Sequence, residues 1–514
     1  MAENKLADEI EELLIKKREE NDNVRGKQFI SNFHVREIWN SNERLETFMN
    51  DAFGSFGTID ESLIDFARKN LLGTLSTLVY MPFRDWSVVW NIWIRYRDTF
   101  PDRTDTKLPA WDCNELKALF KNASSAEGFF KNLGFFTALV IVEGGEHEQK
   151  ERILPYIGKL KKSLGHGRSG EVLEQTIAQG HLMLMDHERN LREQTSDHAV
   201  AVKRLSLPVV TGSPRADEVE MLRILRNDLC NQEHFAIHLA MVFECPQVVH
   251  VLSPLADVDL SKFLAEDKYQ RHRTGRIECL LQQIQHVAQA LEYLHKRLWP
   301  HKGEPKGVCC HMDMKPNNIL VFGLQENTVG NWKLTDFGVS KVSELKGSGS
   351  ERARVTITVS TGATVMGNKY QAPEIEFKMT AGRRSDIWAL GCICLEAIAA
   401  GRGFRNNLER MITVKPNRDG DAHTYFYRPS KLVKIHHSLK GRGHLKKAVG
   451  KWIKSGFAGG EELREEQQSI LNQAKPLILS MLKPEREKRP NAETVVLKLR
   501  EILQNARNAN QQGA

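Results

Sequence analysis

Two short stretches of the sequence decide the fold: His311-Met-Asp-Met-Lys-Pro-Asn-Asn-Ile-Leu320 and, a little further on, Leu334-Thr-Asp-Phe-Gly338. Magnesium is a hard cation that prefers oxygen ligands, so Asp336 and Asn318 predict a metal pair suited to a nucleoside triphosphate. The Asp313 carboxylate can orient or deprotonate an incoming hydroxyl, and Lys315 can neutralise a transferring phosphoryl group. Each piece alone has an ordinary interpretation as a polar loop, but their order predicts a phosphoryl-transfer site.

A glycine-rich loop lies upstream of these stretches. Gly165, Gly167 and Gly170 precede Val172 in a G-x-G-x-x-G-x-V pattern, and a hairpin without Cβ atoms can lie close to phosphates. Three glycines at this spacing are weak evidence alone. A dinucleotide-binding turn would open a helix and lead to an acidic residue about 20 positions on. Sequence typical of strands follows instead, which disfavours that alternative.

A single lysine ends the apolar run Val200-Ala-Val-Lys203, so we expect its side chain to point inward from a strand. A buried ammonium needs an acidic partner. Glu218 is the candidate, because it shares one helical face with an inward-facing stripe of leucines. The sequence therefore predicts a Lys203–Glu218 ion pair that aims the lysine at phosphate oxygens.

Composition and charge exclude several classes of protein. With 41% hydrophobic and 27% charged residues, the chain is typical of a soluble globular protein. The net charge of +8 is mild for 514 residues, so nucleic acid is not an expected partner. The lysine-rich segment 431–454 predicts a solvated or substrate-docking face, because Trp452 is its only aromatic residue. No stretch offers the roughly 20 apolar residues of a membrane span.

The cysteines and the N-terminus indicate a compartment. Eight cysteines are too few for a disulfide scaffold, and their spacing matches no zinc pattern. The charged segment 1–21 lacks the apolar core of a signal peptide. We therefore expect an intracellular protein, cytoplasmic or nuclear.

Together the motifs resemble those of eukaryotic-type Ser/Thr protein kinases over about residues 155–505. The resemblance rests on the glycine loop, the Lys203 strand, the two stretches quoted first, Ala372-Pro-Glu374, Asp386-Ile-Trp-Ala-Leu-Gly391 and Arg489-Pro490. It implies an α+β, bilobal protein-kinase-like fold and an enzyme that uses ATP and Mg²⁺ to phosphorylate protein substrates. The glycine loop with its linker insert, and the region ahead of it, also resemble kinases of filamentous fungi.

The resemblance implies a role for each motif residue. Asp313 would be the catalytic base, Asn318 and Asp336 would hold magnesium, and Lys315 would mark a Ser/Thr rather than a Tyr kinase. The glycines would cover the phosphates, and Lys203 would pair with Glu218. The apolar residues implied at the nucleotide are Val172, Ala201, Leu252 as gatekeeper, Leu255 and Leu320.

Structural roles carry over in the same way. The column of packed side chains anchored by Asp386 would contain Leu222, His311 and Phe337. Glu374 and Arg489 would form a buried ion pair that fastens the substrate-docking segment.

Some features depart from the family pattern. Met312 occupies the place of the usual Arg beside the catalytic Asp, so control by a phosphate on the activation segment is not expected. Gly367 stands where a Thr is usual, with Thr364 the nearest substitute. Two inserts, residues 176–197 and 296–307, are predicted to be surface loops.

The chain divides into four predicted parts. Residues 1–26 form a charged amphipathic helix or tail, more simply solvated than partner-binding, and residues 27–150 form a helical accessory module of unknown role. In that module Trp86, Trp90 and Trp93 share a helical face and predict core packing. Residues 155–505 form the kinase domain, with lobes at about 155–252 and 253–505, and residues 506–514 a disordered tail.

Three functions remain open at this point: an active Ser/Thr kinase, a weak or silent kinase fold that acts as a scaffold through its N-terminal module, and a protein whose main task is binding a protein partner through residues 1–150.

Overall fold

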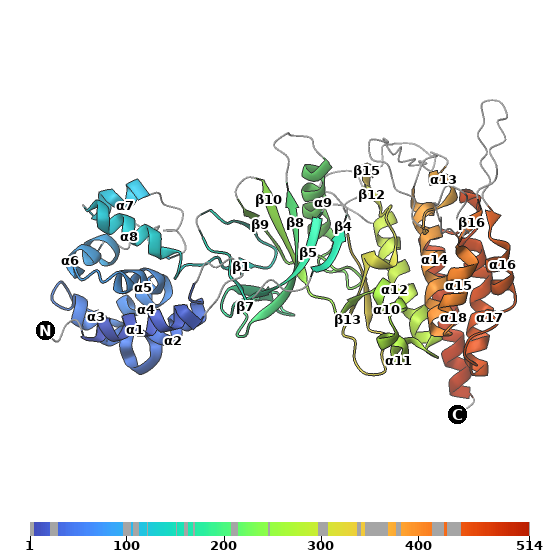
Figure 1. Ribbon diagram of the computed structural model, residues 1–514, viewed down its shortest axis with the longest axis horizontal. Helices are drawn as coiled ribbons and strands as arrows, with labels where there is room; N and C mark the ends of the chain where they lie inside the picture. Colours follow the sequence, from blue (N-terminus) through green and yellow to red (C-terminus); the bar gives the residue numbers. More distant parts are fainter. Residues whose placement is uncertain are drawn as a thin grey trace. The chain divides into compact units, whose positions relative to one another are not determined.

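The computed structural model describes most of the chain. The described residues are 5–20, 29–95, 104–105, 113–120, 122–150, 152–158, 163–167, 170–206, 214–244, 247–296, 307–336, 341–344, 369–376, 382–413, 426–428 and 444–512. Backbone contacts divide the chain into two compact units. Unit 1 contains residues 1–216 and 238–255, and unit 2 contains residues 217–237 and 256–514. Figure 1 labels the elements of both units.

The first part of unit 1 is helical. Its helices are α1 (Lys5–Glu20), α2 (Asn32–Asn40), α3 (Arg44–Phe53), α4 (Glu61–Asn70), α5 (Leu72–Tyr80), α6 (Trp86–Val89), the π-helical turn η2 (Trp90–Ile94), α7 (Cys113–Phe120) and α8 (Ala123–Leu133). Side-chain caps fix where helices begin: the Ser31 hydroxyl accepts from the His34 N–H at α2, and the Asp60 carboxylate accepts from the Leu63 N–H at α4. We call residues 29–142 the helical module.

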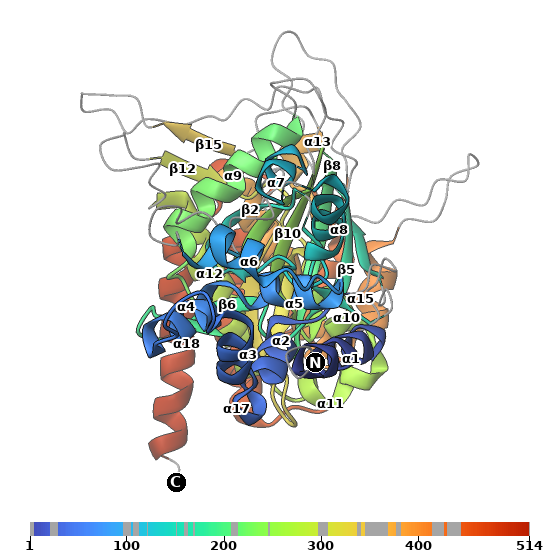
Figure 2. The same ribbon diagram turned by 90° about the vertical axis from the view of Figure 1, so that its left-hand side faces the viewer.

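The helical module has an aromatic core of its own. Trp39 is fully buried, and its indole N–H donates to Ser76 Oγ at 2.8 Å. The predicted core packing of the tryptophan stripe is confirmed for Trp86 and Trp93. Helix α1 packs against α2 and α5 (Figure 2), so its apolar stripe is covered by the module rather than solvated.

The second part of unit 1 is a seven-stranded sheet. Its strands are β2 (Glu146–Glu148), β3 (Tyr156–Ile157), β4 (Ser163–Gly167), β5 (Gly170–Ile177), β8 (His198–Ser206), β9 (Ala240–Glu244) and β10 (Val248–Pro254). The strand order is β2-β9-β10-β8-β5-β3, with β4 also paired to β5. All pairs are antiparallel except β2 with β9. This sheet confirms the expected β-rich lobe.

The expectation of a surface loop at residues 176–197 is wrong. After β5 the chain forms a hairpin of β6 (Leu182–Met185) and β7 (Leu191–Glu193), and β6 pairs in parallel with β1 (Ile141–Val142). His181 and Leu182 are fully buried. The hairpin is ordered because β1, at the end of the helical module, gives β6 a backbone partner. The second insert lies almost wholly outside the described residues.

Unit 2 is mainly helical. Its helices are α9 (Pro214–Leu229, which begins in unit 1), α10 (Leu260–Ala265), α11 (Gln270–Arg273), α12 (Ile277–Lys296), α13 (Pro373–Glu376), α14 (Arg383–Gly401), α15 (Arg405–Ile412), α16 (Lys447–Lys454), α17 (Glu465–Met481) and α18 (Ala492–Gln512). Its short strand pairs are β11 (Val258–Asp259) with β13 (Ile319–Phe322), β13 with β14 (Asn331–Leu334), β12 (Gly307–Cys310) with β15 (Lys341–Glu344), and β16 (Tyr427–Arg428) with β17 (His444–Leu445). Helix α18 continues to Gln512, through most of the segment predicted to be a disordered tail.

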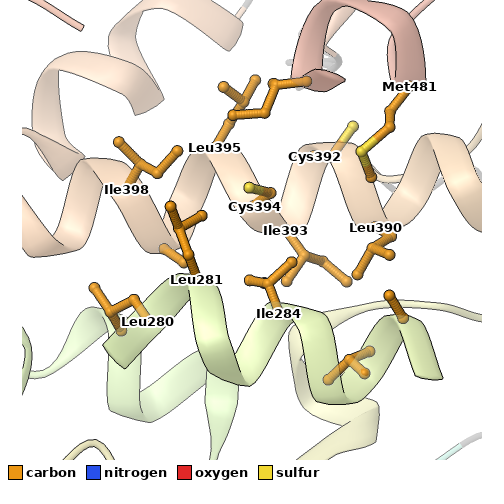
Figure 3. Packing of buried hydrophobic residues seen from close by; sticks show 14 of the residues in the cluster. Leu280, Leu281, Ile284, Leu390, Cys392, Ile393, Cys394, Leu395, Ile398 and Met481 are labelled. Atoms are coloured by element: carbon orange, nitrogen blue, oxygen red, sulfur yellow. The ribbon is translucent and has the colours of Figure 1, made fainter. Parts of the chain in front are cut away.

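The core of unit 2 surrounds α14, which is buried on every side from Ser385 onward. Figure 3 shows Leu281 and Ile284 of α12 directed toward α14, with Ile284 next to Ile393. Met481 of α17 lies against α14 as well. A helix that is buried all round cannot shift without opening the core, so α14 is the fixed element from which this unit positions its loops.

His181 makes the stability of unit 1 depend on pH. Its Nε2 accepts from the Asn32 N–H at 2.9 Å, and its Nδ1 lies 3.1 Å from the Leu139 carbonyl, so the ring is neutral with its proton on Nδ1. Burial, with the nearby Arg36 charge, lowers the pKa of His181 from 6.5 to about 4.

The unfolded chain therefore takes up this proton below about pH 6.5 and the folded chain only below about pH 4. The stabilisation is complete above pH 6.5 and is lost progressively as the pH falls toward 4, by roughly 2 kcal/mol between pH 7 and pH 5. Calorimetric unfolding at these two pH values should show a larger loss in wild type than in His181→Gln. Because other histidines titrate in both proteins, equal losses would contradict the assignment.

Candidate active site

Asp386 organises the loop that contains the predicted catalytic residues. It lies in the first turn of α14 with 2% of its surface exposed. Its Oδ1 accepts from the Met312 N–H at 2.9 Å, and its Oδ2 accepts from the His311 N–H at 3.0 Å. His295 Nε2 of α12 lies 2.9 Å from the same Oδ2. One buried carboxylate therefore fixes the backbone of residues 311–312 to two helices.

The backbone at Met312 needs this support. Its φ is +67°, in the left-handed region that residues with a Cβ rarely adopt. The hydrogen bond from its N–H to Asp386 helps to hold that conformation, and the bend turns the chain toward Asp313.

Three predicted site residues meet immediately after the bend. Lys315 Nζ lies 2.6 Å from Asp313 Oδ2. Asn318 Nδ2 donates to the Asp313 carbonyl at 2.8 Å and to Asp313 Oδ2 at 3.1 Å. The turn η5 (Pro316–Asn318) brings the amide back to the carboxylate. The structure thus places Asp313, Lys315 and Asn318 in one contact set.

Asp336 follows β14 and is tied to the same loop through its neighbour Thr335. The Thr335 N–H donates to the Asn318 carbonyl at 3.0 Å, and the Thr335 carbonyl accepts from His311 Nε2 at 2.9 Å. Asp336 itself has φ of +60°. Phe337 lies outside the described residues, so its place in the predicted column stays a prediction.

The donor set fits magnesium. The Nδ2 group of Asn318 donates both of its hydrogen bonds to Asp313. The side-chain oxygen of Asn318, Oδ1, is therefore the atom that a metal would use. The Asp336 carboxylate would be the second hard ligand. Among the described side chains, no group of three or more His, Cys, Asp or Glu could hold a metal ion.

The glycine loop and the lysine strand lie together in the sheet of unit 1. In the β4–β5 hairpin Gly165 pairs with Val172 and Gly167 with Gly170. Val172 is in turn the cross-strand neighbour of Lys203 on β8. A Cβ at Gly170 would lie 2.3 Å from the Arg204 carbonyl oxygen, so this position requires glycine.

Four of the apolar residues assigned to the nucleotide lie in unit 1, and the fifth, Leu320, lies in unit 2. Ala201 lies on β8 and pairs with Ser253. Leu252 on β10 pairs with Val202 and is fully buried in a cluster with Val200 and Val202, so it lies on the opposite face of the sheet from Ala201 and Lys203, and the structure does not support its prediction as gatekeeper. Leu255 follows β10 and is partly buried, and Leu320 of unit 2 pairs with Lys333. Glu218 lies in α9, but its side chain is outside the described residues, so its pairing with Lys203 stays a prediction.

The predicted Glu374–Arg489 ion pair is confirmed. Arg489 Nη1 and Nη2 donate to Glu374 Oε1 and Oε2 at 2.7 and 2.8 Å, and both residues are buried. The Ser385 hydroxyl donates to Glu374 Oε1 at 2.8 Å, and the guanidinium lies over the Trp388 ring. A paired and fully hydrogen-bonded buried charge of this kind holds α13 rigidly on α14.

Sequence reasoning missed two further groups in unit 2. His295 interrupts the apolar stripe of α12, which was the available signal. Lys369 lies 2.5 Å from Glu396 and 2.7 Å from Glu409, and Tyr370 donates to Glu396 at 2.8 Å. Burial tends to lower the pKa of Lys369, but the two carboxylates outweigh it and the pKa is raised. Gly367 and Thr364 lie outside the described residues.

No helix in the described part of the chain is long and apolar enough to cross a membrane.

The chain is 35% identical to human 3-phosphoinositide-dependent protein kinase 1 over 129 residues, 25% of this chain and 19% of the relative. It is 27% identical to rice CBL-interacting protein kinase 10 over 267 residues, 50% of this chain and 47% of the relative. It is 29% identical to serine/threonine-protein kinase PKH2 of Candida albicans over 136 residues, 26% and 13% of the two chains.

The chain thus matches less than half the length of each of these relatives. Residues 159–498, well over half of the chain, match the family model of the protein kinase domain. With the Asp313 loop, the Glu374–Arg489 pair and the sheet that contains Lys203, this match shows that the chain belongs to the protein kinase family and resembles its Ser/Thr members.

Proposed function

We propose that this protein transfers the γ-phosphate of ATP to Ser and Thr hydroxyls of other proteins. The observation that carries the proposal is the contact set of Asp313, Lys315 and Asn318, in which a carboxylate lies 2.6 Å from an ammonium and 3.1 Å from an amide. This arrangement can hold a hydroxyl and a developing phosphoryl charge at adjacent positions.

Asp313 accepts a hydrogen bond from the substrate hydroxyl and takes up its proton as the hydroxyl oxygen bonds to the γ-phosphorus, while the bond to the β-phosphate oxygen breaks and ADP leaves. Lys315 faces the same carboxylate oxygen and donates to the phosphoryl oxygens as their charge develops. When bound, ATP supplies the phosphoryl group and Mg²⁺ neutralises its oxygens. Asn318 and Asp336 are the residues that we assign to the metal.

The remaining motif residues are assigned to the nucleotide. Lys203, paired with Glu218, is assigned to the phosphates under the backbone of Gly165, Gly167 and Gly170. The residues assigned to the adenine are Val172, Ala201, Leu255 and Leu320; Leu252 is left out because it lies on the other face of the sheet. The cross-strand pairing of Val172 with Lys203 supports one continuous nucleotide surface on the sheet.

Protein substrates follow from the family. We place the protein inside the cell, cytoplasmic or nuclear, in agreement with six free cysteines among the described residues. A scaffold with a silent kinase fold is the alternative, and the contact set around Asp313 argues against it. Such a scaffold would have no need of this arrangement.

The first test removes the assigned groups one at a time. Lys203→Met and Asp336→Asn should abolish measurable labelling of a generic basic protein with Mg-ATP. Asp313→Asn should lower turnover by a factor of about 10² to 10⁴, because the base is lost while the side chain at position 313 can still accept hydrogen bonds from Lys315 and Asn318.

Phosphoamino-acid analysis of the product should show phosphoserine and phosphothreonine only.

Lys498→Met is the matched control, because Lys498 is an exposed lysine of α18 whose ion pair, in the described part of the chain, is with nearby Glu501. It should leave turnover unchanged. Wild-type turnover in Asp313→Asn would refute the assignment, and an inactive wild-type protein that binds nucleotide would favour the scaffold.

The second test concerns the side chain beside Asp313. A phosphate of about −2 charge orders a loop by binding a basic cluster, and Met312 removes the cation that would couple such a phosphate to Asp313. Phosphatase-treated protein, and a variant with Thr356, Thr358, Ser360, Thr361 and Thr364 changed to Ala, should keep activity within about tenfold of wild type. A loss of about a hundredfold, roughly 2.7 kcal/mol of transition-state stabilisation, would show that another cation has taken this role.

A further inference from the structure

The helical module touches the β6–β7 hairpin through the start of α2. His181, in the turn that leads into β6, accepts a hydrogen bond from the Asn32 N–H in the first turn of α2, at 2.9 Å. The ring of Phe29 meets the His181 ring edge to face, with centroids 5.6 Å apart. The imidazole therefore satisfies one of the backbone donors that a helix start leaves without a partner in the helix.

The turn at Gly180 lies closer to α2 than any side chain at this position would allow. Gly180 has φ of +81°, and a Cβ there would lie 2.9 Å from the Phe33 nitrogen. Any residue other than glycine would strain the turn and push it away from α2. The two surfaces are therefore shaped to fit each other.

Charge and apolar contacts extend the same interface. Arg36 Nη2 on α2 lies 2.7 Å from Glu193 Oε2 at the end of β7. Phe29, Ala138, Ile153 and Ala178 form a small buried cluster that contains residues from both sides. The parallel pairing of β1 with β6 adds backbone hydrogen bonds.

The hairpin is also joined directly to the strands assigned to the nucleotide. It leaves the sheet at the end of β5, which contains Val172, and returns at the start of β8, which contains Lys203. The Gln179 N–H donates to Asp197 Oδ1 at 3.0 Å and so closes the base of the hairpin. A displacement of the hairpin would therefore act directly on β5 and β8, because no other element lies between them in the chain.

We propose that the helical module is an intramolecular clamp on the nucleotide-binding sheet. The partner of the α2 surface is the residue 178–193 hairpin of the same chain, and their docking holds β5 and β8 in the arrangement that binds nucleotide. The proposal rests on the proposed nucleotide site in unit 1. It gives the module a function inside the kinase, distinct from recruitment of another protein.

Charge reversal across the interface tests the clamp in the full-length protein. Arg36→Glu and Glu193→Arg should each weaken binding of a non-hydrolysable ATP analogue with Mg²⁺ by about threefold, the scale of a partly exposed ion pair. The double variant restores the pair with its charges exchanged, and should return affinity to within about 1.5-fold of wild type. Arg192→Glu is the matched control, because among the described residues Arg192 pairs with Asp186 inside the hairpin rather than with the module.

Unchanged affinity in both single variants, or a double variant no better than either of them, would overturn the proposal. An equal loss in Arg192→Glu would also overturn it, because hairpin stability alone would then explain the result. Gly180→Val tests the same contact sterically and should weaken analogue binding more than either charge reversal.

Amide hydrogen exchange gives a readout that does not depend on nucleotide. In Arg36→Glu the amides of β5 and β8 should exchange faster than in wild type, and in the double variant they should return to the wild-type rate. If wild-type protein fails to bind the analogue, the proposed function fails, while this exchange pattern still supports the clamp. Unchanged exchange in β5 and β8 would refute the clamp whether or not nucleotide binds.

Discussion

The candidate active site depends on one buried carboxylate. Asp386 projects from the start of α14, a helix buried on every side, and receives the N–H groups of His311 and Met312. An unpaired charge at 2% exposure would be very costly, so the loop and the carboxylate require each other. The hydrogen bond from the Met312 N–H to Asp386 stabilises the positive φ of Met312, and this bend sets the position of Asp313. The loop that contains the candidate catalytic residues is thus held by a helix that is buried on every side.

In unit 1 the glycine loop and the lysine strand require a fixed sheet. The strands that contain them do not by themselves cover the edges of that sheet. Strand β2 pairs with β9 at one edge, and β3 pairs with β5 near the other. Both added strands come from the chain that links the helical module to the sheet. The module and the sheet therefore form one compact unit, which agrees with the clamp inferred from the His181 and Arg36 contacts.

Much of this could be predicted from local sequence. The α+β kinase fold and the Glu374–Arg489 pair followed from motifs whose order in the chain matches a known family. His295 and Lys369 were missed because their partners lie far away in sequence and no motif marks them. The docking of α2 on the 178–193 hairpin could not be foreseen either, since a segment that looks like a loop becomes ordered only when β1 and α2 supply its hydrogen-bond partners.

The most direct test of the account is the turnover of Asp386→Asn at saturating Mg-ATP. An amide keeps the size of the carboxylate but offers one acceptor oxygen where the structure uses two, so at least one of the His311, Met312 and His295 donors loses its partner. We predict a fall in turnover of about a hundredfold or more, with the affinity for a non-hydrolysable ATP analogue nearly unchanged; the unfolding temperature should fall, because a buried donor loses its partner, but the variant should remain folded at the assay temperature. Turnover close to wild type would contradict the claim that Asp386 holds the catalytic loop in place.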